Sequence, residues 1–190
     1  MDIEEIEKHI RGLLVAMGED PEREGLRETP ARVARMYEEA FEGMKYTNRE
    51  IADMFGKTFE VPSDPNSGGA VVLKDISVFS YCEHHMALMY DMKVDVAYVP
   101  RGRVLGLSKI ARICDMAAKR LQLQERLGRD IAEIISLAAL SPDVGVRIEG
   151  RHSCMTSRGI KNVSSKTVTK TYFGAFKEDV SLQNLLGDRV

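Results

Sequence analysis

The stretch VVLKDISVFSYCEHHMALMYDMKVDVAY, residues 71–98, is the one around which the rest of the chain is organised. Residues 71–80 are rich in Val, Ile and Phe, and apolar side chains recur at every second position over 90–98, so both segments are predicted to be β-strands. The tetrapeptide Cys82-Glu83-His84-His85 then lies at the turn between them. Cys82 and His85 have the C-x-x-H spacing that lets two side chains of one turn reach a single metal ion.

A further ligand is expected much later in the chain. Apolar and charged side chains alternate from Val144 to Ile148, which predicts another strand. If that strand continues unbroken through Cys154, the side chains of His152 and Cys154 point inward from the same face.

Cys82, His85 and Cys154 together form a Cys₂His set, which is the protein ligand set of a catalytic zinc with one position left for water. His84 and His152 remain as imidazoles that can move protons near neutral pH. The residues alone leave other interpretations open. A free cysteine is often a small buried hydrophobe, and Cys82 and Cys154 could form a disulfide if the protein were exported.

Composition describes an ordinary globular protein of one domain, or of one domain with a helical appendage. The chain has 190 residues, of which 44% are hydrophobic and 29% charged. A net charge of −2 argues against a general nucleic-acid binder and against a basic membrane-surface protein. Residues 1–17 are acidic and amphipathic, unlike a signal peptide, and no apolar run approaches a membrane span. Three cysteines without a dense spacing pattern fit a reducing compartment, so a cytoplasmic protein is expected.

The first third of the chain is predicted to be helical. Apolar residues recur at helical intervals over 2–17, from Thr29-Pro30 to near Gly43, and from Asn48 to Phe55, with Thr29 and Asn48 as N-caps. A run of turn residues, 63–69, follows. We therefore expect an N-terminal helical region over 1–62 and a second unit over 63–190, working as one functional unit.

The second unit is predicted to contain two strands, two helices, two more strands and a tail. After residues 71–98, a helix is expected from Ser108, another from Leu123, strands over 144–154 and 165–176, and a short helix over 181–186. Strands grouped in hairpin pairs around a helix pair favour an α+β fold with an antiparallel sheet.

Two cations stand in the first turn of the helix predicted from Ser108. Lys109 and Arg112 are three residues apart, so they project from one side of that helix. Cations are unfavourable there unless an anion binds, because the helix N-terminus already carries a partial positive charge. A bound phosphate and a plain solvated charged face are both compatible with this pattern. Glu125, at the start of the next helix, could simply interact with the helix dipole.

These motifs, taken in order, resemble the GTP cyclohydrolase I family over essentially the whole chain. The matching segments are Asp20-Pro21, Gly25-Leu26, Thr29-Pro30, Arg32-Val33-Ala34, Cys82-Glu83-His84-His85, Gly106-Leu107-Ser108-Lys109, Gln122-Leu123-Gln124-Glu125-Arg126-Leu127, His152-Ser153-Cys154 and Arg158-Gly159-Ile160. The resemblance implies the tunnelling fold, a homodecamer and active sites between subunits. It also implies the conversion of GTP and water to 7,8-dihydroneopterin triphosphate and formate, the first step of folate and pterin biosynthesis.

The resemblance assigns the chemistry to the residues singled out above. The zinc ligands fall on Cys82, His85 and Cys154, and the metal makes water nucleophilic for attack on C8 of the guanine. His152 is implied to be the acid/base that protonates the purine nitrogen, with His84 assisting.

The resemblance also assigns substrate contacts. Lys109, Arg112 and Arg158 match triphosphate-binding positions, and Gln124 and Ser108 match neighbouring contacts. Glu125 matches the carboxylate that reads guanine, whose N1–H and exocyclic amine are two donors that one carboxylate can accept. The chain departs from the family where many members continue the histidine pair with x-x-Pro-Phe, since it has Met86-Ala87-Leu88. That difference affects the shape of the turn more than the chemistry.

Two other functions compete with this hypothesis. A related tunnelling-fold reductase acting on a deazaguanine nitrile would use a cysteine nucleophile and a nicotinamide cofactor, and the Cys₂His set argues against it. A structural metal site in a nucleotide-binding or scaffolding protein would make chelation unfold the chain.

Overall fold

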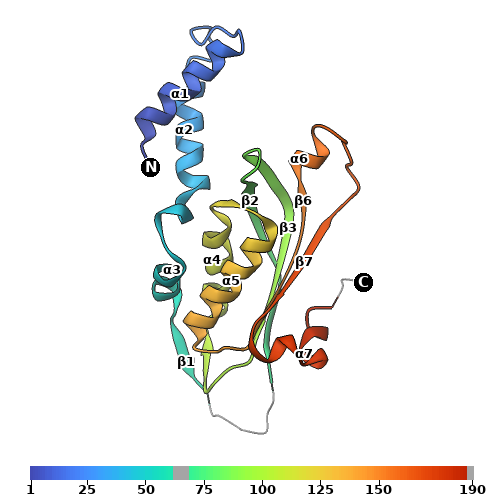
Figure 1. Ribbon diagram of the computed structural model, residues 1–190. Helices are drawn as coiled ribbons and strands as arrows, with labels where there is room; N and C mark the ends of the chain where they lie inside the picture. The colour runs from blue at the N-terminus through green and yellow to red at the C-terminus, as the bar shows by residue number, and fades with distance from the viewer. Residues whose placement is uncertain (62–68, 188–190) are drawn as a thin grey trace.

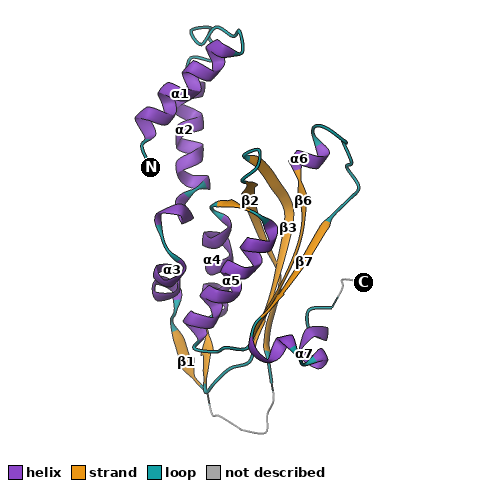
Figure 2. Ribbon diagram, viewed as in Figure 1, coloured by secondary structure: helices purple, strands orange, loops and turns teal. Residues whose placement is uncertain are grey.

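The computed structural model describes residues 1–61 and 69–187, which form an α+β fold (Figures 1 and 2). The helices are α1 Ile3–Ala16, α2 Thr29–Ala40, η1 Glu42–Lys45, α3 Asn48–Phe55, α4 Leu107–Ala118, α5 Gln124–Ala139, α6 Ser153–Thr156, η2 Gly174–Lys177 and α7 Val180–Asn184. The strands are β1 Thr58–Glu60, β2 Val71–Cys82, β3 Ala87–Tyr98, β4 Arg103–Leu105, β5 Leu121–Gln122, β6 Val144–His152 and β7 Thr167–Tyr172. The predicted turn residues 63–68 and the expected boundary after residue 62 lie outside the described residues.

The main sheet has five strands in the order β5-β2-β3-β6-β7. The pairs β2–β3, β3–β6 and β6–β7 are antiparallel, whereas β5 runs parallel to β2 and pairs only with Tyr81 and Cys82. The sequence predicted the four antiparallel strands. It missed β5, and also the small β1–β4 sheet, because two or three residues are too few to display an alternating pattern.

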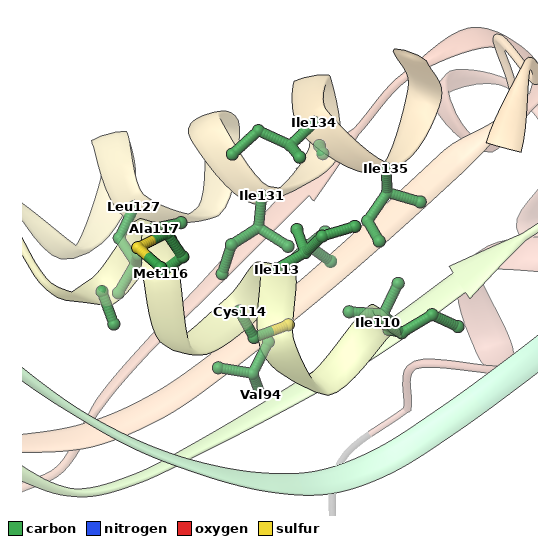
Figure 3. Close-up of a cluster of buried hydrophobic side chains, with 14 of the residues drawn as sticks. Val94, Ile110, Ile113, Cys114, Met116, Ala117, Leu127, Ile131, Ile134 and Ile135 are labelled. Atoms are coloured by element: carbon green, nitrogen blue, oxygen red, sulfur yellow. The ribbon is translucent and has the colours of Figure 1, made fainter. Parts of the chain in front are cut away.

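Helices α4 and α5 cover one face of the sheet, and the main core lies between these two layers (Figure 2). Ile110 and Ile113 of α4 meet Ile131 of α5 above Val94 of β3, and all four side chains are fully buried (Figure 3). Burying an aliphatic side chain of this size contributes about 1.5–3 kcal/mol, so this layer dominates the stability of the fold. Cys114 lies in the same core, as its position on the apolar stripe of the helix predicted.

The C-terminal segment covers part of the opposite face of the sheet. Phe176 and Leu186 pack on Ala97 of β3 in a second, smaller core. A side chain at Gly145 of β6 would leave no room for them, since a Cβ there would lie 2.6 Å from Phe176 Cδ1 and 2.7 Å from Leu186 Cδ1. The predicted fourth strand therefore ends at Tyr172, and the chain then turns back over the sheet.

The N-terminal helices α1 and α2 form a hairpin that extends away from the sheet (Figure 1). None of the residues Ile3–Ala16 is buried, so the apolar stripe of α1 has contacts with α2 and little else. The N-caps differ from those predicted. Thr29 is the first residue inside α2, and Thr47, rather than Asn48, caps α3 in a capping box with Glu50.

The side chain of Arg120 forms hydrogen bonds between the N-terminal helical region and α5. Its guanidinium donates to the carbonyls of Gly43 and Tyr46 at 3.0 and 2.9 Å, to Asn48 Oδ1 at 2.7 Å and to Asp130 Oδ2 at 3.0 Å. One side chain thus joins the segment before α3 to the start of α5. Among the described helices, none combines the length and the apolar character needed to cross a membrane.

Candidate active site

The turn that carries the Cys-Glu-His-His tetrapeptide is held against the start of α5. Cys82 is the last residue of β2, and residues 83–86 form the turn into β3. The backbone N–H of Glu83 donates to the carbonyl of Gln122 at 3.1 Å, and the Glu83 carboxylate forms an ion pair with Arg126. Leu88, at the departure from the family pattern, pairs with Tyr81 and accepts a hydrogen bond from Ser153 Oγ at 2.7 Å. The hairpin closes without the proline, with Cys82 paired to Ala87 and with Met86 in the left-handed region at φ 49°.

The end of β6 brings the second half of the cluster to the same place. His152 is the last residue of β6, and the chain then enters the single turn of α6, which carries Cys154. The strand therefore does not continue to Cys154 as predicted. The turn nevertheless places Cys154 beside Cys82 and His152, with one ligand atom from each residue within 4.8 Å of the others.

This cluster suits a soft or borderline metal ion. Burial raises the pKa of the Cys154 thiol, and the adjacent Cys82 thiol raises it further, because two thiolates side by side repel each other. A divalent cation between them would remove that repulsion. Zinc binds well to two sulfurs and one imidazole, whereas magnesium and calcium prefer oxygen ligands. The three cysteines, all within the described part of the chain, are free thiols.

The structure brings together two of the three predicted ligands, Cys82 and Cys154, and sets His152 in the third place. His85 is exposed on the turn, and its Nε2 lies 3.4 Å from the Arg158 guanidinium. The neighbouring ring of His84 is also exposed, with its centroid 6.5 Å from that of His85. Both imidazoles are therefore exposed on the turn that follows Cys82.

His152 is half-buried between the cluster and α5. Burial lowers the pKa of its imidazole, and the nearby Glu125 carboxylate opposes that effect. The ring nitrogen Nε2 lies 2.9 Å from Oε1 of Gln124. Gln124 was predicted to contact substrate, yet its side chain is only 1% exposed and has hydrogen-bond partners within the chain. Glu125, in contrast, is exposed and lines a groove between α5 and β7.

The remaining predicted contacts lie at the opposite end of α4 from the cluster. Ser80 Oγ donates to the carbonyl of Ala118 at 2.7 Å, so the C-terminal end of α4 adjoins β2 close to Cys82. Lys109, in the first turn, lies with its Nζ 6.0 Å from the ring of Phe55. Nine residues of helix separate it from Ala118, which is roughly 14 Å along the axis. Within one chain, Ser108 and Lys109 therefore do not meet the cysteines, and Arg112 lies midway along α4. Gly106, rather than Ser108, precedes the first residue of this helix as its N-cap.

No role was predicted for Gln122 and Arg126, although both lie in the segment 122–127 that resembles the family. Arg126 Nε donates to Gln122 Oε1 at 3.0 Å, and Gln122 donates in turn to Asp130 Oδ2 at 2.9 Å. Together with the Glu83 ion pair, these bonds position the turn that carries His84 and His85. Gln122 and Arg126 are four residues apart where α5 begins, and this spacing was the sequence feature that could have predicted their contact.

Comparison with known proteins identifies the family of this chain. A family model described as GTP cyclohydrolase I matches residues 6–189. A protein named GTP cyclohydrolase 1 from Ruminiclostridium cellulolyticum is 62% identical over 190 residues, covering 98% of this chain and 96% of its own. Proteins of the same name from Clostridium acetobutylicum and Clostridium botulinum are 58% and 56% identical, covering 96% and 98% of this chain and 94% and 96% of theirs. A crystal structure of the archaeosine synthase QueF-Like in the apo form aligns with 57% of this chain and 97% of its own, at 24% identity and a TM-score of 0.47.

Proposed function

This chain belongs to the GTP cyclohydrolase I family, and from that premise we infer that it converts GTP and water into 7,8-dihydroneopterin triphosphate and formate. That reaction is the first step of folate and pterin biosynthesis. The observation that carries the inference is the cluster of Cys82, His152 and Cys154, which the end of β2 and the junction of β6 with α6 bring together.

We propose that zinc is the metal of this site, held by Cys82, His85 and Cys154. Zinc, when bound, supplies a Lewis acid that makes water nucleophilic near neutral pH. The two sulfurs are already adjacent. His85 is exposed on a turn, and the hydrogen-bond partner described for its ring is the Arg158 side chain. A change of the His85 rotamer would release the ring from Arg158. The competing arrangement has His152 as the third ligand, which the distances in the cluster favour.

The other residues of the chain bind and protonate the substrate in this proposal. His152 exchanges the proton at the purine nitrogen as the imidazole ring of guanine opens, and His84 assists from the turn. Glu125, exposed and close enough to influence the pKa of His152, accepts hydrogen bonds from guanine N1–H and the exocyclic amine. Arg158, beside the cluster, neutralises part of the triphosphate charge.

Ser108, Lys109 and Arg112 complete the triphosphate site only if a second copy of the chain supplies them. We therefore propose a homodecamer with its active sites between subunits. The sheet supports assembly, since β7 is an edge strand of the described sheet and β5 pairs with only two residues of β2. The reduced thiols that the site requires also support a cytoplasmic location.

Purified, zinc-loaded protein given GTP tests the activity. We expect equimolar formate and a pterin that becomes fluorescent after oxidation, and unchanged GTP would contradict the assignment. The zinc content of two variants tests the ligand set. If His85 is the ligand, His85→Asn loses zinc, whereas His152→Asn retains zinc and loses turnover. The reverse result would make His152 the ligand.

A further inference from the structure

Gln124 is the first residue of α5, and its side chain fills a buried position between that helix, β6 and β7. Its amide nitrogen donates to the carbonyl oxygens of Ile148 and Thr167, both at 3.1 Å, and reaches Thr169 Oγ1 at 3.3 Å. Both donor hydrogens of the amide are therefore engaged by backbone oxygens of two neighbouring strands.

These contacts determine which way the amide points. A carbonyl oxygen can only accept, so exchanging the amide oxygen and nitrogen would place Oε1 against two other oxygens and leave two buried carbonyls without this donor. With the nitrogen toward the strands, Oε1 faces His152 Nε2 at 2.9 Å. An amide oxygen also can only accept, so the hydrogen in that contact belongs to His152 Nε2.

We propose that Gln124 is a positioning residue that holds neutral His152 in the tautomer protonated on Nε2, so that Nδ1 carries the lone pair. The chain of bonds runs from the paired strands β6 and β7, through one buried amide, to the imidazole. The inference rests on the proposed function for its consequence, since Nδ1 is then the atom of His152 that accepts a proton or binds the metal. With the other tautomer, the atom available to the reaction would be Nε2, on the side occupied by Gln124.

This role differs from a substrate contact. At 1% exposure, the Gln124 amide could reach a bound guanine only by giving up its bonds to both strands. Removing a partner that orients an active-site histidine reduces activity by about 10- to 100-fold. We expect that loss in kcat, with KM for GTP nearly unchanged, whereas a lost guanine contact would raise KM.

Solid-state ¹⁵N NMR of zinc-loaded protein labelled at its four histidines reads the tautomer directly, without regard to the size of an oligomer. The His152 signals are identified by their loss in His152→Asn. In the unsubstituted protein we expect a protonated Nε2 and an unprotonated Nδ1. A protonated Nδ1 with an unprotonated Nε2 would overturn the proposal.

Two variants extend the test. Gln124→Leu should give a mixture of His152 tautomers and the loss of kcat, because a leucine side chain offers His152 Nε2–H no acceptor. Gln122→Leu is the matched control, because Gln122 is an equally buried amide, 0% exposed, whose described bonds go to Ala117, Arg126 and Asp130. It should leave the His152 signals unchanged. A pure Nε2–H tautomer in folded Gln124→Leu would overturn the proposal, whereas failure of the proposed function would appear separately, as unchanged GTP in the unsubstituted protein.

Discussion

The two ends of α4 carry different parts of the candidate site, and they differ in how complete they are within one chain. At the C-terminal end, β2, β6 and α6 already place Cys82, His152 and Cys154 together, and we call this the thiol end. At the N-terminal end, Ser108 and Arg112 are exposed and Lys109 is half-buried, and we call this the cationic end. Among the described residues, no group of potential metal ligands includes any of these three. The fold of one chain thus assembles the thiol end, while in our proposal the cationic end binds the triphosphate for a neighbouring copy.

The largest expected effect is at the thiol end. Cys154→Ser should lose bound zinc and about 1,000-fold or more of GTP turnover together, because the remaining groups cannot hold the metal. Metal analysis and a formate assay on the same sample measure both. Cys114→Ala is the control, since burial in the core raises the pKa of that thiol and keeps it protonated, away from the site. If Cys154→Ser retains zinc and turnover, the thiol end is not the metal site.

At the cationic end, the double variant Lys109→Ala/Arg112→Ala should retain zinc and lose about 100-fold or more in kcat/KM for GTP. Each lost hydrogen bond to a charged group costs about 1.5–3 kcal/mol. Steady-state kinetics with parallel metal analysis separates this result from the one at the thiol end. Loss of zinc in the double variant would instead show that the two ends are coupled within one chain.

Mixing the two inactive proteins tests whether the ends belong to different copies. Co-expressed Cys154→Ser and Lys109→Ala/Arg112→Ala subunits should assemble sites in which an intact thiol end meets an intact cationic end. Random assembly of equal amounts restores about a quarter of the full turnover. Tandem purification through two different tags selects the mixed oligomers. Activity no higher than the mean of the two parents would place both ends of each site in one chain.

The smallest effect is expected at Glu149, which belongs to neither end. Lys166 and Arg147 donate to its carboxylate at 2.7 and 2.9 Å and lower its pKa to about 2. A depressed carboxyl pKa stabilises the folded state above the unfolded pKa of 4.5, and this contribution is lost as pH falls toward 2. Glu149→Gln should therefore reduce stability by about 1–3 kcal/mol at pH 7 and by much less at pH 3.

Urea midpoints at the two pH values, taken at one protein concentration, measure this difference. Zinc content and KM should stay unchanged, which would separate a loss of stability from the losses specific to either end. An equal destabilisation at both pH values would rule out the ion pairs as its cause.

Much of the fold follows from local patterns. Alternation over residues 90–98 predicted β3, helical periodicity predicted α1, α4 and α5, and the α+β tunnelling fold implied by the family resemblance is confirmed. What the sequence did not reveal depends on neighbours distant in the chain. β5 pairs with β2, which lies forty residues earlier. The short helix predicted over 181–186 is present as α7, but its packing over the sheet depends on the space that Gly145 leaves for Phe176 and Leu186.

The site divides in the same way. Spacing and strand parity predicted that Cys82 and Cys154 would meet, even though the chain turns after His152 where an unbroken strand was expected. The orientation of Gln124 could not be predicted, because carbonyls of β6 and β7 determine it. The rotamer of His85 depends on Arg158, more than seventy positions later. The roles assigned to the individual site residues remain predictions that the variants above test.

Gly145 makes the closure of the C-terminal tail depend on a single missing methyl group. The methyl group of an alanine there would clash with Phe176 and Leu186 and displace the C-terminal segment from the sheet. The uncovered apolar patch around Ala97 would then compete with the strand edges for contacts between copies. Gly145 thus keeps this apolar patch beneath the tail and out of contacts between copies.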